Sequence, residues 1–584
     1  MGTISDKLMR IINTKEDIRQ ALISKGYDVP TSIPFKEYAK MILDLPCKVD
    51  SFPDIEGIVA RYSASGLTNE QMAANPVWVD KTGNGHDIQL KNFSWKGMSG
   101  VGGYEMNFNL WRNNVSSIPD ISMSTTTTSV SVSVGNSTYN NNLIYTHISN
   151  WDINKNHWLK VTSTYEDGDL AFIFYKGSNT KKIGLPANGY VNILAYPEFK
   201  GSYMYISTIS NKQGSFTIEQ LPLYPGALVF DGVDDYGVCE NFPILTKEKG
   251  YTVVVLRQWD QDFLNTTLTG GLLSTRNYST GEGVAFEKIE SSNKGYWNLG
   301  AGGIIDFAKS PFTWQTSKQY NNVGILKGDK NHGKPLCVGC GLSGGQQCGR
   351  FAIWELVFLD HDATEEELTK IKDYFVKTYP WLFPDKAWTV TGKTNEDEDR
   401  ATIANITGNG NDLVLSNFGF AEGSGYNEEG EYAGYLVTDG VDDKIISSIF
   451  KMGNDWTVIG DWELINTGKN DNAGIVKFDS IVIYNYNYNY NSMLINIKNG
   501  RNILIPDQNT VNAICSDGRI YSKDWKESIY NEETESTSKN FLTIGYSGNA
   551  YTKIAFKNLA IYPTVLSRED CIKAYNYLQT LKAK

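Results

Sequence analysis

The chain has 584 residues, a formal net charge of −12 and a hydrophobic content of 41%. A chain of this length exceeds one hydrophobic core, so several domains are expected, and its acidity disfavours nucleic acid or an anionic membrane as a partner. No apolar run approaches the length that spans a bilayer. The N-terminus lacks the pattern of a secretory signal, so we expect synthesis in a cytoplasm.

Residues 1–48 have the spacing of short helices. Leu8, Ile11 and Ile12 form one apolar stripe, Thr14 is placed to cap a second helix, and Pro34 begins a third. So few residues make a marginal core, and we expect the helices to dock elsewhere. They are either a cap on the next domain or a module that attaches the chain to another protein.

The rest of the chain contains an internal repeat. Residues 231–235 and 439–443 both read Asp-Gly-Val-Asp-Asp, and each segment lies between apolar runs typical of strands. Thr-Gly-Asn-Gly precedes both segments. An apolar strand and a helix follow both, with Thr364 and Ser567 as the helix N-caps. The spacing from acidic turn to N-cap is nearly equal in the two copies, which predicts one fold used twice.

From Thr-Gly-Asn-Gly to the acidic turn, the first copy spans 149 residues and the second 32, so the first carries roughly 117 extra residues, which is enough for a small domain. Within this insertion, Ser129 to Val134 alternates polar and apolar residues, as a half-buried strand does. Residues 166–169 are predicted to form a hairpin turn between two further strands. The predicted domains are a helical module at 1–48, a first sandwich at 49–103 and 223–385, an inserted sandwich at 104–222, and a second sandwich at 386–584.

These ordered motifs resemble laminin-G-like, concanavalin-type domains. The resemblance implies a mainly β fold of two-sheet antiparallel jelly rolls, which commonly bind glycans or proteins. Residues 6–39 resemble the N-terminal modules of tail and appendage proteins of bacteriophages, especially those of gut Bacteroides. Together the resemblances imply a homo-oligomeric tail or fibre protein of the virion, made in the host cytoplasm, whose N-terminal helices attach it to other virion proteins.

Residues 484–491 alternate Tyr and Asn. As a strand, this segment places Tyr484, Tyr486, Tyr488 and Tyr490 on one face, because strand side chains alternate with a period of two. One interpretation is a flat platform that stacks on sugar rings of a host-surface polysaccharide. The other is a strand whose rings cover a neighbouring sheet or subunit.

The resemblance to laminin-G-like domains also implies a calcium ion at the sandwich rim, since carboxylate and carbonyl oxygens suit a hard cation. The sequence itself requires no cofactor. The alternative is that Asp and Asn stabilise tight turns by bonding their own backbone, and Asn405 in place of Asp80 weakens the calcium case in the second copy. The candidate ligands are Asp80, Asn84, Asp234 and Asp235 in the first copy, and Asn405, Asn409, Asp442 and Asp443 in the second.

Hydrolases with a concanavalin-like fold use two nearby carboxylates from one strand, and a retaining enzyme needs them roughly 5 Å apart. The sequence contains no strand of that pattern, no phosphate-binding loop, and no local motif that would support a Ser/His/Asp set. We therefore expect a non-enzymatic structural or adhesive protein. A glycan-active hydrolase (depolymerase) is the alternative. A bacterial surface adhesin is a third candidate, which the missing secretion signal disfavours.

The seven cysteines are odd in number and thinly spread, so they do not form a disulfide framework. The spacing of Cys337, Cys340 and Cys348 suggests zinc. However, residues 336–340 align with residues 542–546 of the second copy, which contain no thiol. We expect free or structural thiols, with a zinc site as the alternative.

Overall fold

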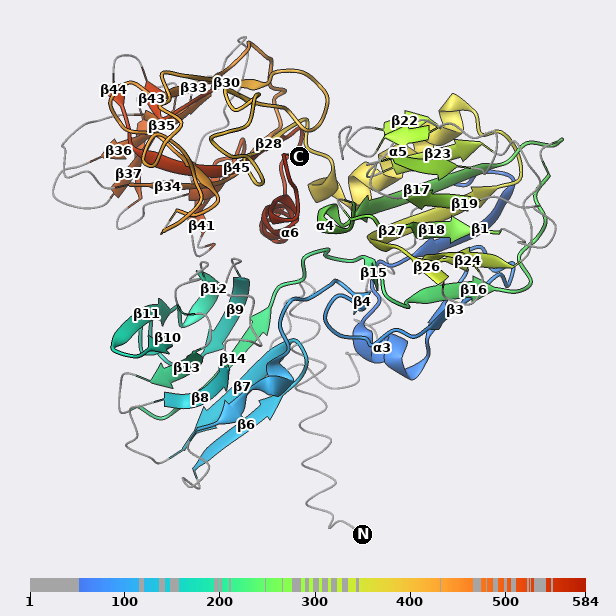
Figure 1. Ribbon diagram of the computed structural model, residues 1–584, viewed down its shortest axis with the longest axis horizontal. Coiled ribbons are helices and arrows are strands. Elements are labelled where there is room, and N and C mark those ends of the chain that lie inside the picture. The colour runs from blue at the N-terminus through green and yellow to red at the C-terminus, as the bar shows by residue number, and fades with distance from the viewer. Residues whose placement is uncertain are drawn as a thin grey trace, which may run out of the picture. The chain divides into compact units, whose positions relative to one another are not determined.

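The structure is a computed structural model that describes most of residues 52–583. The predicted helical module at 1–48 lies outside the described residues. The described chain is mainly β and forms three sandwiches of two sheets each (Figure 1). No helix in this part is long and apolar enough to cross a membrane. The longest internal gaps in the description are 148–156, 276–284, 466–473 and 530–541.

The first sandwich is built from two separate parts of the chain. Its strands before the insertion are β1 Ile58–Ser63, β2 Val77–Trp78, β3 Ile88–Lys91 and β4 Gly100–Val101. Those after it are β15 Leu228–Asp231, β16 Tyr236–Cys239, β17 Thr252–Trp259, β18 Gly270–Ser274, β19 Ala285–Lys288, β20 Lys294–Trp297, β21 Ile304–Asp306, β22 Trp314–Thr316, β23 Val323–Lys327, β24 Leu336–Val338, β25 Cys340–Leu342, β26 Gln346–Cys348 and β27 Arg350–Leu359. One sheet has the order β22-β23-β17-β27-β15-β4, with β1 beside β27, and the other has the order β2-β3-β16-β24-β18-β19-β20-β21. This confirms the predicted discontinuous sandwich.

The central strands β17 and β27 are buried on both faces. Every residue of β17 is buried, and one side of the strand contributes to the core between the sheets. Helix α5 (Glu365–Thr378) contacts the other face of β27, where the hydroxyl of its Tyr374 lies 3.5 Å from Glu355. The predicted capping box is present, since Thr364 and Glu367 bond each other's backbone N–H. Shorter helices are α3 Asn69–Ala74, α4 Gln261–Leu264, η1 Phe108–Leu110 and η4 Pro380–Leu382.

The second sandwich repeats this strand order without the insertion. Its strands are β28 Lys386–Thr389, β29 Thr402–Ile403, β30 Leu413–Ser416, β31 Gly425–Asn427, β32 Tyr435–Val437, β33 Lys444–Ser447, β34 Thr457–Leu464, β35 Gly474–Phe478, β36 Ile481–Tyr486, β37 Ser492–Ile497, β38 Arg501–Ile505, β39 Val511–Cys515, β40 Arg519–Ser522, β41 Glu527–Ile529, β42 Thr543–Ile544, β43 Tyr546–Ser547, β44 Ala550–Tyr551 and β45 Ile554–Tyr562, followed by α6 Arg568–Gln579. The order β29-β30-β33-β42-β35-β36-β37-β38 matches one sheet of the first sandwich throughout. The order β31-β32-β45-β34-β39-β40-β41 matches the other sheet from β31 to β39, but beyond it β40 pairs antiparallel with β39, whereas β22 pairs in parallel with β23.

The shared fold extends to individual residues. β24 and β42 take the same place in their sheets, as the alignment of residues 336–340 with 542–546 predicts. Gly339 and Gly545, which follow these strands, have φ values of 91° and 73°, a region that favours glycine. A side chain at Gly339 would also collide with Phe230. The two copies therefore share local backbone geometry as well as topology.

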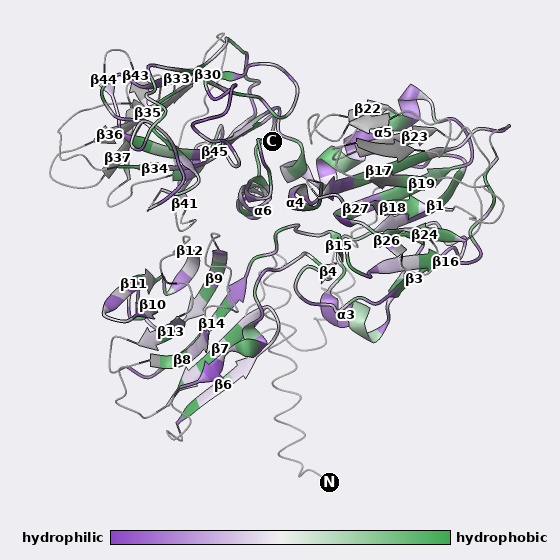
Figure 2. Ribbon diagram, viewed as in Figure 1, coloured by the Kyte–Doolittle hydropathy of each residue, from purple (hydrophilic) through white to green (hydrophobic). Residues whose placement is uncertain are grey.

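The inserted sandwich has sheet orders β11-β10-β13-β8-β5 and β12-β9-β14-β7-β6. Its strands are β5 Arg112–Asn113, β6 Ile121–Thr125, β7 Ser129–Val134, β8 Asn142–His147, β9 His157–Ser163, β10 Leu170–Lys176, β11 Asn179–Leu185, β12 Asn188–Ile193, β13 Tyr203–Thr208 and β14 Gly214–Gln220. β7 is half-buried, as predicted from its alternation. Figure 2 shows hydrophobic residues within strands such as β9 and β18.

One prediction in this region is wrong. Residues 166–169 are not a hairpin turn, because β9 and β10 do not pair and lie in opposite sheets. Leu159 and Phe172 belong to the same core cluster, so the two strands face each other across the sandwich. An acidic turn can join two apolar strands that pair in one sheet or two that face each other from opposite sheets. The packing of the core decides which of the two forms.

Candidate functional site: acidic turns and an exposed tyrosine face

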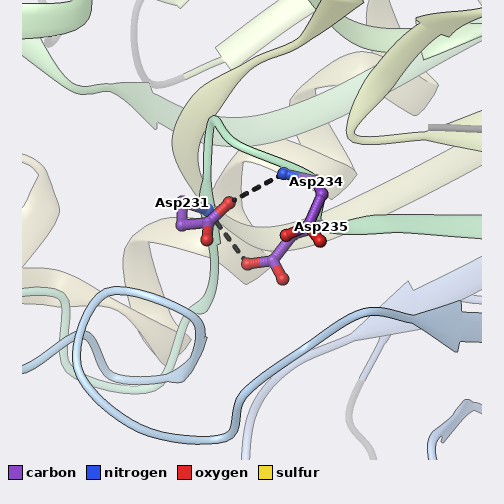
Figure 3. A group of neighbouring side chains, drawn as sticks. All are labelled: Asp231, Asp234 and Asp235. Carbon is purple, nitrogen blue, oxygen red and sulfur yellow. Dashed lines mark hydrogen bonds between the residues drawn. The ribbon is translucent and has the colours of Figure 1, made fainter. Parts of the chain in front are cut away.

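The first acidic turn lies where the chain passes from one sheet of the first sandwich to the other, between β15 and β16. Asp231 Oδ1 accepts the N–H of Val233 at 2.7 Å and that of Asp234 at 3.4 Å. Asp235 Oδ2 accepts the N–H of Asp231 at 3.0 Å (Figure 3). These two carboxylates thus bind the backbone of their own turn, as aspartates commonly do in tight turns.

The last aspartate of each acidic turn is fully buried. Ser99 Oγ donates to Asp235 Oδ1 at 2.9 Å. Burial and the charge of Asp231 raise the pKa of Asp235 to about 7, although hydrogen bonds from Ser99 and from the Asp231 N–H oppose the rise. In the second turn Asp443 Oδ2 accepts the N–H of Asp439 at 2.7 Å, and burial raises the pKa of Asp443 to about 6. In both copies the buried carboxyl therefore belongs to the turn by which the chain passes from one sheet to the other.

Each acidic turn gathers three carboxylates, the arrangement expected to attract a cation. Oxygens of Asp231, Asp234 and Asp235 lie within 4.8 Å of one another, and the three aspartates of residues 439–443 do the same. Such oxygens suit calcium, which takes roughly six to eight of them. However, both oxygens of Asp235 already accept hydrogen bonds from the protein. The contacts within the turn are sufficient to hold its shape.

Asp80 and Asn84, the other candidate ligands of the first copy, lie in a separate turn after β2. Asp80 Oδ1 accepts the N–H of Arg61 at 3.0 Å and the hydroxyl of Thr82 at 2.8 Å. Asn84 Nδ2 donates to the carbonyl of Val59 at 2.9 Å. The structure therefore connects these residues to β1 and does not bring them into the group of acidic-turn carboxylates.

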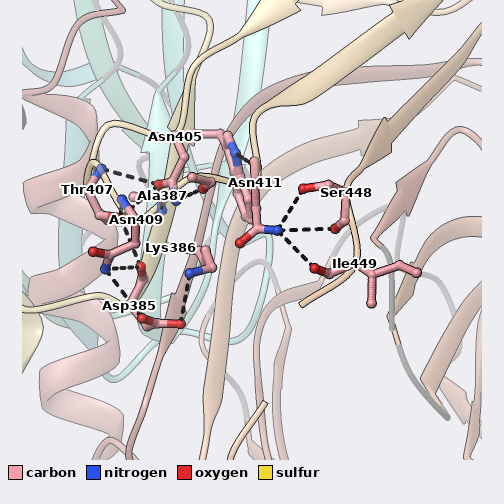
Figure 4. A network of polar contacts seen from close by, with 11 residues as sticks. Asp385, Lys386, Ala387, Asn405, Thr407, Asn409, Asn411, Ser448 and Ile449 are labelled. Atoms are coloured by element: carbon pink, nitrogen blue, oxygen red, sulfur yellow. Dashed lines mark hydrogen bonds and ion pairs between the residues drawn. The ribbon is translucent and has the colours of Figure 1, made fainter. Parts of the chain in front are cut away.

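Asn405 replaces Asp80 in the second copy and makes the equivalent contacts (Figure 4). Asn405 Oδ1 accepts the N–H of Ala387 and the hydroxyl of Thr407, both at 3.0 Å. Its N–H donates to Asp412 at 2.8 Å, as the N–H of Asp80 does to an aspartate of the first copy. A carboxylate and a side-chain amide each offer an acceptor oxygen, but only the carboxylate is charged. The same contacts are thus made with and without a charge, which supports the alternative that Asp80 stabilises its turn by hydrogen bonding.

The tyrosine platform predicted at 484–490 falls only partly within the described residues. Tyr484 and Tyr486 lie on β36, which pairs with β35 and β37, so this half of the segment is a strand. Tyr488 and Tyr490 lie outside the described residues. A sugar platform at this place stays a prediction.

A different group of tyrosines lies on the inserted sandwich. Tyr145 is on β8, Tyr175 on β10, and Tyr203 and Tyr205 on β13. Strand register places Tyr205 opposite Tyr145, and Tyr203 opposite Tyr175. Because β8, β13 and β10 are neighbours, these side chains share one face of the sheet, whereas Met204 points to the core. We call the four residues the tyrosine face.

The rings of the tyrosine face contact one another. Ring centroids of Tyr145 and Tyr203 are 5.8 Å apart and those of Tyr175 and Tyr205 are 5.3 Å apart, both edge to face. Burial raises the pKa of Tyr205, and the nearby hydroxyls of the other three tyrosines raise it further. Tyr203 is 47% exposed and Tyr175 is 36% exposed. The four residues therefore form a preformed, partly exposed aromatic patch.

Sequence reasoning missed the tyrosine face, although one signal was present. Tyr203 and Tyr205 alternate with Met204 and Ile206, which predicts two rings on one side of a strand. Nothing in the local sequence shows that Tyr145 would lie beside them, because that depends on the order of the strands in the sheet.

The six cysteines of the described part are buried, and no disulfide joins them. Cys340 lies opposite Cys348 across β25 and β26, and with Cys337 and Val238 these residues form a small apolar cluster. Among the described residues, the groups of three or more His, Cys, Asp or Glu side chains close enough to hold a metal ion are the two acidic turns, and the three thiols are not among them. Free or structural thiols, with a zinc site as the alternative, stay a prediction.

No protein-family model matches the chain, and no curated protein matches it. Among solved structures, the binding domain of botulinum neurotoxin serotype D is similar at 12% identity, over 60% of this chain and 89% of that one, with a TM-score of 0.23. A Trypanosoma rangeli sialidase in complex with sialic acid is similar at 9% identity, over 80% of this chain and 85% of that one, with a TM-score of 0.20.

Proposed function

We propose that the protein is a non-enzymatic adhesion component of a bacteriophage tail or fibre, and that it binds a host-surface glycan through the tyrosine face. The partly exposed cluster of Tyr145, Tyr175, Tyr203 and Tyr205 carries this proposal. Tyrosine combines a large rigid apolar ring with a polar hydroxyl, so it can stack on a sugar ring and bond its hydroxyls at low entropic cost.

The proposal of a virion location is supported by the resemblance of residues 6–39 to phage attachment modules. In this arrangement the N-terminal helices bind other virion proteins, and the sandwiches contact the host. Assembly as a homo-oligomer would present several tyrosine faces together and raise avidity without any new contact. Antibody against residues 386–584 should label tails or fibres of particles in electron micrographs. Labelling of infected-cell lysate but not of purified particles would contradict the virion location.

Replacing Tyr175 and Tyr203 together by Ala should weaken glycan binding at least about tenfold, as expected when central aromatic anchors are lost. Both side chains are substantially exposed, so we expect little change in stability. The measurement is retention of the full chain on an array of bacterial surface polysaccharides. Val414→Ala is the matched control, because Val414 is an exposed apolar residue on a strand of the second sandwich. Equal binding by the double variant and the wild type would contradict the proposal.

A second candidate function is glycan hydrolysis, and one observation favours it. Asp235, with a pKa of about 7, lies beside Asp231, with one oxygen of each carboxyl group within 4.8 Å of the other, and a pair of neighbouring carboxyl groups with one raised pKa is what a hydrolase uses. Against it, Asp235 is fully buried, and the same arrangement recurs at Asp443 in the second copy. A turnover assay on capsular polysaccharide distinguishes the candidates: activity abolished by Asp235→Asn would establish the enzyme.

A further inference from the structure

One row of residues crosses all five strands of the sheet that carries the tyrosine face. From β5 to β11 its members are Arg112, Tyr145, Tyr205, Ile173 and Lys182, each opposite the next in strand register. Neighbouring strands lie about 4.8 Å apart, so the row is roughly 19 Å long. Arg112 and Lys182, at its two ends, are exposed. Two cations thus flank the aromatic centre of this face.

The guanidinium of Arg112 is held in place by the protein. Arg112 Nη1 donates to the carbonyls of Asn109 and Trp111, at 3.0 and 3.1 Å. These bonds use one nitrogen of a group that carries five N–H donors. A guanidinium fixed in this way is preorganised to bind a carboxylate or phosphate with its other nitrogens.

The charge of the five strands is opposite to that of the chain. The whole chain has a net charge of −12, whereas β5, β8, β10, β11 and β13 contain no Asp or Glu. The acidic turn at 166–169 precedes the opposite end of β10, roughly 17 Å along the strand from Tyr175. Glu166 and Asp169 of this turn are both paired with Lys212. The basic residues of the five strands are Arg112, Lys176, Lys181 and Lys182.

We propose that the glycan bound by the tyrosine face is an acidic oligosaccharide. Its carboxylate or phosphate groups bind Arg112 and Lys182, and its sugar rings stack on the tyrosines between them. Because the row is roughly 19 Å long, the two charged groups belong to different sugars of the oligosaccharide, with other sugars between them. This inference rests on the proposed glycan-binding function and adds the chemical class of the ligand.

Charge complementarity favours an acidic glycan over a second copy of this chain. In a two-fold symmetric contact the same patch meets itself, so the cations of one tyrosine face would meet the cations of the other. Like charges placed opposite each other destabilise such a contact. An anionic ligand instead neutralises both ends of the row while covering its aromatic centre.

The test compares polygalacturonate with the same polymer after its carboxylates are reduced to alcohols, together with a panel of acidic and neutral bacterial polysaccharides. The full chain should bind acidic forms at least about tenfold more tightly than neutral ones, and higher salt should reduce this preference. Arg112→Gln with Lys182→Gln should remove the preference and leave binding to neutral forms. The matched control is Lys160→Gln with Lys212→Gln, which removes equal charge from the same sandwich and should preserve the preference.

The outcomes separate the inference from the proposed function. Equal binding of acidic and neutral forms, unchanged by Arg112→Gln with Lys182→Gln, would overturn the acidic ligand and leave glycan binding intact. Failure to bind any member of the panel would overturn both. If Tyr175→Ala with Tyr203→Ala instead lowered the oligomeric mass in solution, the tyrosine face would be a contact between copies, and the inference would be wrong.

Discussion

Arg61→Ala should lower the free energy of unfolding of the first sandwich by about 3–5 kcal/mol, the cost of breaking a buried ion pair. Arg61 Nε lies 3.2 Å from Glu355 Oε2, and the two side chains are 5% and 0% exposed. Tyr379 donates to Glu355 at 2.7 Å, and Arg61 donates to Tyr374 at 2.8 Å. Without the arginine, a buried carboxylate loses its opposite charge. Hydrogen exchange of amides in β1 and β27 measures the loss locally, because a chain of several domains gives no single two-state transition.

The second sandwich supplies the control, because it forms the same fold without this ion pair. The register of β28 on β45 places Ala387 and Asn558 where the first copy has Arg61 and Glu355. The double variant R61A/E355N should therefore recover most of the stability lost in Arg61→Ala, since it removes the unpaired charge together with its partner. A double variant as unstable as the single one would show that burial of an uncompensated charge is not the cause.

The second large effect is a dependence of stability on pH. Asp235 has a pKa of about 7 in the fold against a usual value of 3.8, so the folded chain binds the proton more tightly than the unfolded chain. The stabilisation that results from proton binding by Asp235 is complete below about pH 4 and is lost as pH rises through 7. At 1.36 kcal/mol per unit, the loss is at most about 4 kcal/mol. Asp235→Asn should flatten this profile and stabilise the first sandwich above pH 7, because an amide retains an acceptor for the Asp231 N–H and is never charged.

This measurement also tests the calcium expectation. Hydrogen exchange of the first sandwich is followed from pH 4 to 8 with a metal chelator present. The free energy of unfolding should fall with rising pH in the wild type and should not fall in Asp235→Asn. Asp443→Asn should act in the same way on the second sandwich, over a narrower range that ends near the Asp443 pKa of about 6. If excess calcium reversed the fall in the wild type alone, the acidic turn would bind the ion. Equal destabilisation by Asp235→Asn at every pH would contradict the linkage.

Local sequence patterns correctly predicted several elements of the fold. The capping box at Thr364, the half-buried strand ending at Val134, and the repeated Asp-Gly-Val-Asp-Asp turn are all present where the sequence predicts them. Each depends on interactions within a few residues, such as a side chain that bonds a nearby N–H. The hairpin predicted at 166–169 failed because its flanking strands pack across the sandwich, and a turn sequence contains no information about that choice.

By itself the sequence determined that one β fold occurs twice and that a smaller β domain interrupts the first copy, since spacing and alternation are properties of neighbouring residues. The tertiary structure alone decided which strands share a sheet, and with that which side chains meet. Tyr145 and Tyr205 are 60 positions apart and lie opposite each other only because β8 pairs with β13. Arg112 and Lys182 flank them because β5 and β11 are the edge strands of the same sheet. Strand pairing brings distant residues together through backbone hydrogen bonds, which look alike whatever the side chains are.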